Sequence, residues 1–285
     1  VTAVRFKRWD GSEGRATGKV FVIAAHAIET PRLLLNSVSD ATPAGVANSS
    51  DQVGRNLMDH PTQLSWALAN DPVYPYRGPL STSGIENLRD GTFRKERGAF
   101  RIEIGNNGWA WPTGAPINTA ARLAGQGIRG KALDNALRYQ AARHVRLAAA
   151  VEQPPDPDNR VTLDRKDRDM YGVPHPRLAY RLDDYVKAGL AAALAAHDEI
   201  FARLGTTGVR HSPDAQGAGH IIGTMRMGDD PKTSVVDRDL RSHDHANLFV
   251  LGSSVFCTSA TANPTLTIAA LALRAVDQVK ATVAG

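Results

Sequence analysis

Short apolar runs open the chain and predict β-strands. Val4 and Phe6 alternate with polar residues and lead to Asp10-Gly11, so we expect a strand that ends in a hairpin turn. Lys19 to Ala25 is an almost continuous apolar run of strand length, which is typical of a strand buried on both faces of a parallel sheet.

A helix is expected soon after the second of these runs. Thr30 can cap its N-terminus, and Pro31 suits the first helical position because no N–H group is needed there. A buried strand followed by a tight turn and a capped helix forms one half of a nucleotide-binding βαβ unit. The pattern therefore predicts part of a nucleotide-binding α/β domain near the start of the chain.

The rest of the chain alternates between irregular and regular patterns. Residues 70–130 are rich in Gly, Pro and Asn and predict irregular structure with short strands. The later regular elements are expected to be a helix over Ala132–Ala150, strands over Arg160–Asp164 and Leu178–Leu182, a helix capped by Asp183 or Asp184 that runs to Leu204, a buried strand over Asn247–Leu251 and a final helix over Leu266–Ala284. Together these patterns predict a mixed α/β fold.

Composition and charge narrow the possible classes of function. The 285 residues can bury one large or two modest cores, and 42% hydrophobic with 22% charged residues is ordinary for a globular protein. No apolar run reaches the roughly 18–20 uncharged residues of a membrane span, so no integral membrane segment is expected. The net charge of +5 arises from Lys and Arg residues interleaved with acidic residues, and this pattern does not predict nucleic-acid binding.

The sequence does not predict a metal site. A single cysteine, Cys257, excludes an internal disulfide and a cluster of thiolate ligands. His243 and His245 are separated by one residue and could chelate an ion, but no carboxylate cluster with ligand spacing accompanies them. We therefore expect no metal in this chain.

Two polar residues stand in distinctive frames in the last quarter of the chain. His220 lies in the segment Gly219–Gly228 (GHIIGTMRMG), and Asn263 follows Asn247–Ser254 (NLFVLGSS) and precedes a long apolar run. An imidazole titrates near neutral pH and can accept a hydroxyl proton and return it, and an asparagine amide can donate to the same oxygen without adding charge. Together such side chains can bind and deprotonate a hydroxyl group, although each residue alone could be an ordinary core histidine or a helix-start asparagine.

These frames resemble the C-terminal part of the glucose–methanol–choline (GMC) oxidoreductases, flavoenzymes that oxidise alcohols and sugars. In that family the catalytic histidine lies four residues before the threonine of a Gly-Thr-x-x-Met frame, as His220 lies before Thr224, and a second catalytic His or Asn occupies the place of Asn263. The resemblance implies an FAD-dependent oxidoreductase with His220 as the acid/base and Asn263 as a clamp on the substrate oxygen. Hydride would pass to flavin N5 from a CH–OH group of a sugar, polyol or sugar acid.

The resemblance also implies which residues contact FAD. Small side chains after the first buried strand let the backbone approach the cofactor, although His26 stands where the family usually has glycine. Gly252 replaces an aspartate that is common in the family, and the free N–H groups that start the last helix suit the negative charge of reduced flavin. The residues expected at the cofactor are Ala24, Ala25, Thr30, Gly252, Ser253, Asn263, Pro264 and Thr265.

The fold implied by the resemblance is an FAD/NAD(P)-binding Rossmann-like domain joined to a substrate domain with a mainly antiparallel sheet covered by helices. Residues 1–60 and 229–285 are assigned to the FAD-binding domain and residues 61–228 to the substrate domain. The family's Gly-x-Gly-x-x-Gly loop is absent, and Gly217-Ala218-Gly219 does not replace it because it leads into the His220 frame. We therefore expect an incomplete Rossmann-like domain and a chain that is a fragment.

Further segments resemble one subgroup of the family, the large subunits of bacterial gluconate, fructose and FAD-dependent glucose dehydrogenases. These segments are Asn56–Pro61, Arg77–Pro79, Asn159–Val161 and Thr265–Ala272. The subgroup implies a periplasmic or membrane-associated complex in which a small subunit and a cytochrome c are partners and electrons do not pass to oxygen; a cytoplasmic location stays open. His60, in the first segment, is expected to have a structural role near the flavin.

Two other interpretations stay open from the sequence. The chain could come from a GMC alcohol oxidase, a choline-type dehydrogenase or a flavin-containing lyase, and substrate profiling with oxygen and with dye acceptors separates these. It could also be a truncated, non-catalytic half-protein that needs an N-terminal part. A purified chain of that kind would bind no FAD.

Overall fold

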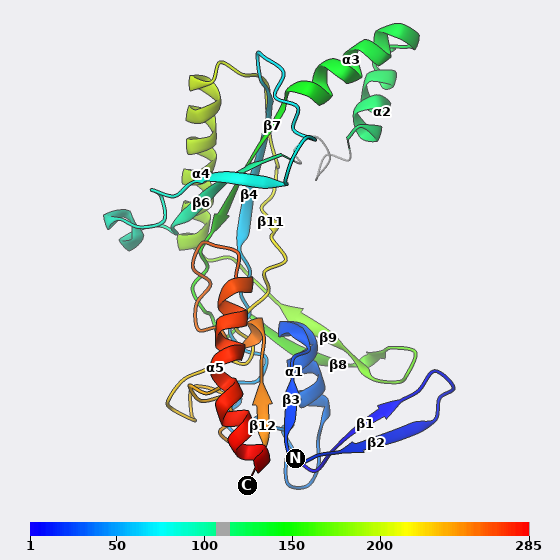
Figure 1. The fold of residues 1–285 in the computed structure, drawn as a ribbon, viewed down its shortest axis with the longest axis vertical. Helices are drawn as coiled ribbons and strands as arrows, with labels where there is room; N and C mark the ends of the chain where they lie inside the picture. Colours follow the sequence, from blue (N-terminus) through cyan, green and yellow to red (C-terminus); the bar gives the residue numbers. More distant parts are fainter. Residues whose placement is uncertain (107–114, 285) are drawn as a thin grey trace.

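The two predicted buried strands lie side by side. The chain is described here by a computed structural model that covers residues 1–106 and 115–284. In it β3 (Phe21–Ile23) and β12 (Leu248–Val250) pair in parallel, and α1 (His26–Asn36) and α5 (Thr265–Ala284) lie beside them (Figure 1). We call these four elements, together with two hairpins that extend from them, the parallel-strand lobe.

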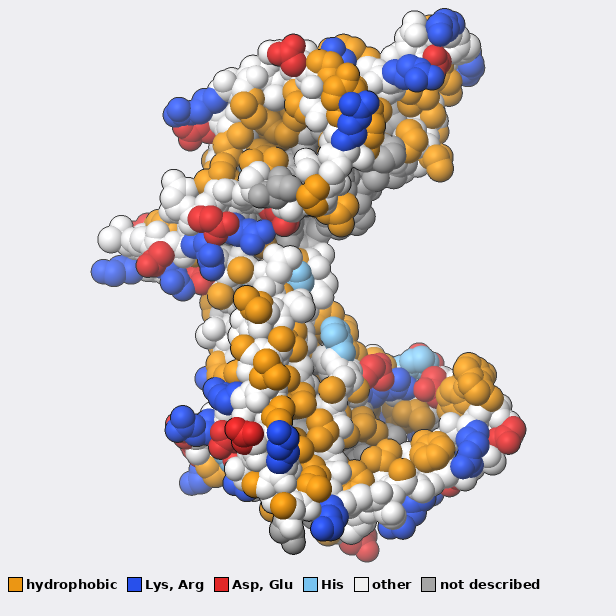
Figure 2. All heavy atoms as spheres, in the orientation of Figure 1, with side chains coloured by type: hydrophobic (Ala, Val, Ile, Leu, Met, Phe, Trp, Pro, Cys, Tyr) orange, Lys and Arg blue, Asp and Glu red, His pale blue; other side chains and the backbone are white. Residues whose placement is uncertain are grey.

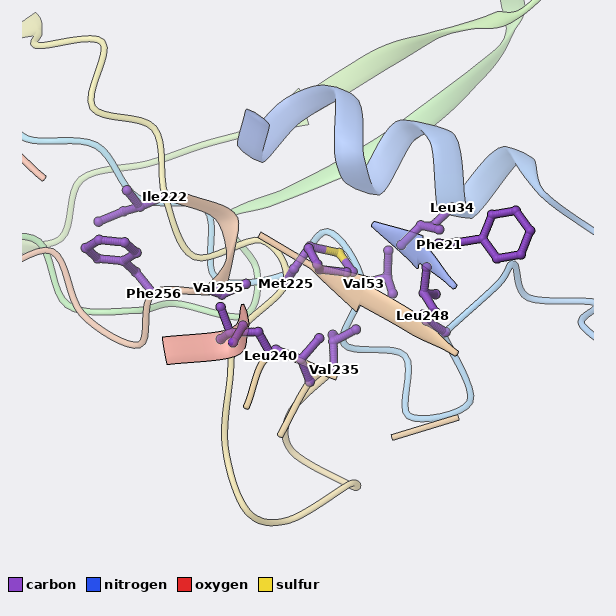
Figure 3. Packing of buried hydrophobic residues seen from close by; sticks show 14 of the residues in the cluster. Phe21, Leu34, Val53, Ile222, Met225, Val235, Leu240, Leu248, Val255 and Phe256 are labelled. Carbon is purple, nitrogen blue, oxygen red and sulfur yellow. The ribbon is translucent and has the colours of Figure 1, made fainter. Parts of the chain in front are cut away.

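Apolar side chains from distant parts of the sequence fill this lobe (Figure 3). Phe21 and Leu248 of the paired strands share one buried cluster with Leu34 of α1 and with Ile222 and Met225 of the His220 frame. Burial of a side chain of this size stabilises a fold by roughly 1.5–3 kcal/mol. The core therefore holds the His220 frame against the parallel strands.

Helix α1 begins earlier than the sequence indicated, and Thr30 is not its N-cap. The helix starts at His26, whose φ of 69° turns the chain after β3, and Pro31 lies inside it. A proline has no N–H for the carbonyl four residues before it, which here belongs to Ala27. The Thr224 hydroxyl donates to that carbonyl at 2.7 Å, so the earlier turn of helix forms without leaving the carbonyl unsatisfied. Thr30 is consequently a buried helical residue.

Two antiparallel hairpins extend from this lobe, β1–β2 (Ala3–Lys7 and Glu13–Thr17) and β8–β9 (Arg160–Arg168 and Pro174–Ala179). The first is the hairpin predicted from the alternating pattern. The second contains both strands expected beyond residue 160, although its return strand lies over 174–179 and not 178–182. It packs against α1, where Arg32 pairs with Asp169 at 2.8 Å and donates through Nε to the Pro174 carbonyl at 2.8 Å.

A six-stranded antiparallel sheet forms the other part of the molecule, which we call the sheet lobe. Its strands lie in the order β10-β4-β7-β6-β5, and β11 pairs with β4. The strands are β4 (Pro61–Leu68), β5 (Ser81–Ile85), β6 (Phe100–Gly105), β7 (His144–Val151), β10 (Thr207–His211) and β11 (Gln216–Gly217). The accompanying helices are η1 (Thr92–Lys95), α2 (Ile117–Gly125), α3 (Gly130–Arg143) and α4 (Asp184–Arg203). Helix α4 covers one face of the sheet, as predicted for the substrate domain (Figure 1).

The predicted helix over Ala132–Ala150 is wrong in its second half. Helix α3 ends at Arg143, and the residues from His144 onward form β7, between β4 and β6. Leu147 and Ala149 of β7 lie in the cluster buried under α4. Alanine side chains fit a helix or a strand, so the local pattern did not reveal the pairing of β7 with strands distant in sequence. Helix α2 likewise lies within the segment expected to be irregular.

The two helices of 20 residues, α4 and α5, form where the sequence predicted them. Asp183 accepts a hydrogen bond from the Val186 N–H at 2.8 Å, and Gly205, with a φ of 60°, follows the end of α4. Helix α5 begins at Thr265, directly after Pro264. Within the described residues, no helix is both long and apolar enough to cross a membrane.

Candidate functional site

The carboxyl ends of β3 and β12 meet at one edge of the parallel-strand lobe. The N–H of Leu251 donates to the carbonyl of Ile23 at 2.8 Å, which continues the strand pairing. The pair Ala24-Ala25, which follows β3, therefore lies near Gly252-Ser253, which follows β12. Ligands of open α/β folds bind outside the carboxyl ends of parallel strands. The structure thus brings together two of the segments expected at the cofactor.

The segment after β12 is fixed against the His220 frame. Gly252 has a φ of 103°, and nothing lies within 4 Å of the position a Cβ would take, so the space beside it is open. The carbonyl of Ser253 accepts from the Gly223 N–H at 3.3 Å, and the carbonyl of Ser254 accepts from the Met225 N–H at 2.8 Å. These bonds hold the His220 frame at the strand ends.

The His220 frame also pairs with the segment that leads into β4. Met58 and Ile222 exchange two backbone hydrogen bonds of 3.0 and 2.9 Å. Gly223 has a φ of 95°, and a Cβ there would lie 2.2 Å from a backbone carbonyl oxygen of the neighbouring segment. This close approach therefore requires glycine. It brings His60, two residues after Met58, next to His220.

Asp59 fixes the backbone around both histidines. Its carboxylate accepts from the N–H groups of His60 at 2.7 Å, His220 at 2.8 Å and Gly219 at 3.2 Å. Three hydrogen bonds to one charged group are stronger than bonds between neutral groups. The side chains of His60 and His220 therefore start from a rigid backbone.

The two imidazole rings touch each other. The Nδ1 atoms of His60 and His220 are 3.1 Å apart, and the ring planes cross at 81° with centroids 5.1 Å apart. The Nε2 of His60 lies 2.9 Å from the carbonyl oxygen of Ser259. His60 is fully buried and His220 is half-buried, so His220 is the member of the pair that a substrate can reach.

Burial favours the neutral form of both rings. Burial is the main cause that lowers the pKa of His60, although its hydrogen bond to Ser259 opposes the shift. Burial also lowers the pKa of His220, and the negative charges of Asp59 and Glu103 oppose it. A neutral imidazole keeps one lone pair, so His220 is able to act as a base near neutral pH.

Asn263 lies directly before Pro264 at the start of α5. The Asn263 side chain is exposed, and no hydrogen bond joins it to His220 within the described residues. The two frames are linked indirectly, because Ser259, four residues before Asn263, contacts His60. The pairing of His220 with Asn263 at a substrate therefore stays a prediction.

The residues at the strand ends fit a dinucleotide cofactor. Ala24 and Ala25 are exposed and have small side chains, and the space beside Gly252 is open. Within the described part of the chain, the buried hydroxyl oxygens of Thr30 and Ser254 have no hydrogen-bond partner.

Three residues that support the site were missed by sequence reasoning. Gln153 accepts, through one side-chain oxygen, from the Asp59 N–H at 3.0 Å and from the Tyr180 hydroxyl at 2.8 Å. Burial raises the pKa of Tyr180 to about 12, so this hydroxyl stays protonated and can donate. Ser259 contributes the carbonyl that meets His60. They come from three separate segments, and no motif or spacing marked them.

Comparison with known proteins identifies relatives of this chain. Residues 155–272 match the family model described as GMC oxidoreductase. The chain is 39% identical over 279 residues to the fructose dehydrogenase large subunit of Gluconobacter japonicus, a match that covers 98% of this chain and 50% of that protein. It is 29% identical over 280 residues to the 2-methyl-1,2-propanediol dehydrogenase of Mycolicibacterium austroafricanum, which covers 94% of this chain and 49% of that protein. The chain thus spans about half the length of the curated relatives it matches.

Solved structures share the fold. A structure of formate oxidase from Aspergillus oryzae RIB40, studied for the modification of its FAD, matches with a TM-score of 0.70 and 17% identity. The match covers 98% of this chain and 57% of the other. The mixed α/β fold with a mainly antiparallel sheet, predicted from the sequence, is confirmed.

Proposed function

The chain belongs to the GMC oxidoreductase family, whose members are FAD-dependent enzymes, and we propose that it forms about half of a dehydrogenase for a CH–OH group of a sugar, polyol or sugar acid. The family and the cofactor predicted from the sequence are confirmed. The proposed reaction rests on the environment of His220. Its imidazole is half-buried, burial lowers its pKa, and its frame packs beside the carboxyl ends of two parallel strands.

His220 would act as the acid/base of the reaction. Its neutral ring takes the hydroxyl proton of the alcohol while the carbon loses a hydride, and the product is a carbonyl. Bound FAD supplies the hydride acceptor at its N5 atom. Asn263 would donate a hydrogen bond to the substrate oxygen and orient it without adding charge. Positioning the reacting groups in this way can lower the barrier by several kcal/mol.

The cofactor would lie along the edge where β3 and β12 end. Ala24, Ala25 and Thr30 would meet it from β3 and α1, and Gly252 and Ser253 from the segment after β12. The residues that would meet it from the start of α5 are Asn263, Pro264 and Thr265. The first N–H groups of α5 carry partial positive charge and suit an anionic group of the cofactor.

We also propose the division of the chain into domains that the sequence suggested. Residues 1–60 and 229–285 would belong to the FAD-binding domain, which accounts for β3, β12, α1 and α5. Residues 61–228 would form the substrate domain, which accounts for the six-stranded sheet and α4. The β8–β9 hairpin and the His220 frame belong to residues 61–228 but pack in the parallel-strand lobe, so these two parts of the substrate domain would contact the cofactor domain.

Substrate and partners are proposed from the relatives. The match to a fructose dehydrogenase large subunit favours a sugar or polyol as substrate and a multisubunit enzyme. From the subgroup resemblance, a small subunit would be a partner, a cytochrome c would take the electrons in place of oxygen, and the complex would be periplasmic or membrane-associated. The fructose dehydrogenase relative shares 39% identity with this chain, which supports the substrate class more strongly than it supports one particular sugar.

A second candidate function is a half-protein that has no activity alone. The apolar side chains of Leu266 and Leu273 on α5 are 83% and 73% exposed, and Figure 2 shows hydrophobic side chains over this helix. The chain also spans half of its relatives. An isolated chain of residues 1–285 that binds no FAD would favour this second candidate.

The test is anaerobic flavin reduction in the full-length enzyme that contains this chain. Flavin absorbance should bleach with fructose, gluconate, glucose or sorbitol, and the reduced flavin should be reoxidised faster by a dye or cytochrome c than by oxygen. His220→Ala should retain FAD and lose reduction by the substrate. Normal reduction in that variant would overturn the assigned role of His220. Fast reoxidation by oxygen would favour an alcohol oxidase, and bleaching by none of these compounds would refute the substrate class.

A further inference from the structure

His60 contacts the ring of His220, the proposed base, directly. It is fully buried, yet both ring nitrogens meet polar atoms: Nε2 faces the Ser259 carbonyl at 2.9 Å and Nδ1 faces the Nδ1 of His220 at 3.1 Å. These two contacts constrain which ring nitrogen of His60 carries the hydrogen.

The contacts fix the direction of each hydrogen bond. A carbonyl oxygen can only accept, so the Nε2 of His60 carries the ring hydrogen and donates to Ser259. A neutral imidazole has one N–H, and the Nδ1 of His60 is then an acceptor. The hydrogen between the two rings must belong to the Nδ1 of His220. The Nε2 of His220 is left without a hydrogen and keeps its lone pair.

We propose that His60 is a positioning residue that holds His220 in the Nδ1–H tautomer, with Nε2 as the basic atom that takes the substrate proton. The inference rests on the proposed role of His220 as the base. It gives His60 a second effect as well. When His220 gains a proton, its Nδ1–H still points at a neutral acceptor, and the hydrogen bond becomes charge-assisted and stronger. His60 therefore stabilises the protonated base that the reaction produces.

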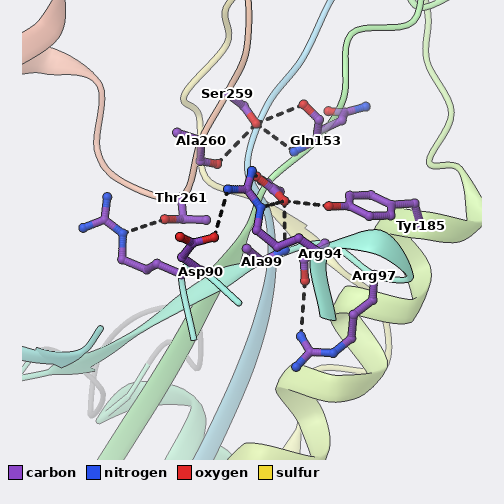
Figure 4. A network of polar contacts seen from close by, with 12 residues as sticks. Asp90, Arg94, Arg97, Ala99, Gln153, Tyr185, Ser259, Ala260 and Thr261 are labelled. Carbon is purple, nitrogen blue, oxygen red and sulfur yellow. Dashed lines mark hydrogen bonds and ion pairs between the residues drawn. The ribbon is translucent and has the colours of Figure 1, made fainter. Parts of the chain in front are cut away.

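The carbonyl at the far end of this chain of bonds is itself held in place (Figure 4). The backbone N–H of Gln153 donates to the Ser259 hydroxyl at 2.7 Å, and that hydroxyl donates to the Gln153 carbonyl at 3.0 Å. Two residues farther on, Thr261 accepts from Arg89 at 2.9 Å. These bonds tie residues 259–261 to the sheet lobe, so the acceptor for His60 has a fixed position.

Burial keeps His60 neutral, although the negative charge of Asp59 favours a positive charge on both rings. The Asp59 carboxylate accepts hydrogen bonds from three backbone N–H groups. From β6, Glu103 favours and Arg101 disfavours protonation of His220, and these two side chains pair with each other at 3.0 Å. Protonation of His60 would either set two N–H groups against each other between the rings or require His220 to change tautomer. His60 is also the more deeply buried ring, so the first proton goes to His220.

Three substitutions at position 60 separate the two contacts in the full-length holoenzyme. His60→Asn keeps an acceptor near the position of Nδ1, His60→Gln keeps a donor near the position of Nε2, and His60→Leu keeps neither. His60→Leu should slow flavin reduction by about 100-fold, within the usual range for general acid–base catalysis, and shift the acid limb of the pH–rate profile to lower pH. His60→Asn should recover more of this rate than His60→Gln, with little change in KM.

A matched control is available in the sheet lobe. His197 is also fully buried and bonds to Ser65 on β4 at 2.8 Å, away from the His60–His220 pair. His197→Leu should lower stability while the pH–rate profile stays at its wild-type position. An unchanged profile and rate in folded His60→Leu, or an equal shift in His197→Leu, would overturn the proposal.

The tautomer can be measured without any turnover. In protein labelled with 15N-histidine, NMR should show the His220 Nε2 without a bound hydrogen and its Nδ1 with one, and His220→Ala identifies the signals. A hydrogen on Nε2 of His220 in the wild-type protein would overturn the proposal even if His60→Leu fails to fold. If no polyol reduces the flavin, the proposed reaction fails, while the NMR result still decides the tautomer.

Discussion

The hydrogen bond from Thr224 to Ala27 predicts a defined loss of stability when it is removed. Thr224→Val keeps the shape of the side chain but removes the donor, and Pro31 cannot replace it. Removing the donor leaves the fully buried Ala27 carbonyl unsatisfied, which costs about 1–3 kcal/mol. We expect the free energy of unfolding to fall by about 1–3 kcal/mol, measured by urea denaturation of the protein without FAD.

Thr30→Val is the matched control for this change. Thr30 is also fully buried in the same region, but its hydroxyl has no hydrogen-bond partner within the described residues. The same substitution there removes a buried unpaired polar atom, so the free energy of unfolding should stay within about 0.5 kcal/mol of wild type or rise. If Thr224→Val costs no more than Thr30→Val, the account of how α1 accommodates Pro31 is wrong.

A double-mutant cycle with Pro31 tests whether Thr224 acts through its hydrogen bond to the Ala27 carbonyl. Pro31→Ala returns an N–H group at the position where the helix would donate to the Ala27 carbonyl. In that background Thr224→Val should cost at least about 1 kcal/mol less than it does alone, because the carbonyl has a second donor. Equal costs in the two backgrounds would show that Thr224 acts by some contact other than this hydrogen bond.

Gly223→Ala should destabilise the fold by more than about 3 kcal/mol, because strain at its φ of 95° adds to a Cβ placed 2.2 Å from a backbone oxygen. Gly252→Ala, with a similar φ of 103° but open space, should cost about 1–2 kcal/mol in the same urea titration. Asn263→Ala should slow anaerobic flavin reduction at least about tenfold with FAD still bound, and an unchanged rate would remove Asn263 from the proposed mechanism. Burial lowers the pKa of His197 to about 3, so the folded state binds fewer protons than the unfolded state. Stability should therefore fall as the pH drops from about 6.5 toward 3, and His197→Leu should flatten that fall in denaturation curves.

Elements whose signals are local were predictable from the sequence. The cap at Asp183 and the stop at Gly205 bracket α4, and Pro264 marks the start of α5. The β1–β2 hairpin follows from alternation around a turn. In each case a few adjacent residues carry the information, and no distant partner changes the outcome.

Two wrong predictions, the start of α1 and the helix over residues 144–150, have causes that lie far away in the sequence. The start of α1 depends on Thr224, which lies 197 residues from the carbonyl it satisfies. The local pattern of β7 predicts a helix because alanine suits a helix as well as a strand. The strand forms because β7 pairs with β4 and β6. Both outcomes depend on contacts that a window of neighbouring residues does not contain.

The candidate site divides in the same way. The frame of His220 is a local motif, so the sequence predicts this residue, whereas Asp59 and His60 lie in the Asn56–Pro61 segment, where no local signal indicates a partner. Their arrangement around His220 depends on the pairing of Met58 with Ile222, which are distant in sequence. Gln153 and Ser259 carried no signal, since an ordinary Gln and Ser gain their roles only by position.

Residues 56–61 join the His220 frame to the sheet lobe. Met58 pairs with the His220 frame, Asp59 holds its backbone, and His60 contacts the imidazole. The same segment then continues without a break into β4 of the sheet lobe. A shift of the sheet against the parallel strands would therefore move His220 and its acceptor together. Proton transfer depends on positions accurate to a fraction of an ångström, so the proposed base would keep its position relative to its acceptor if the sheet moved.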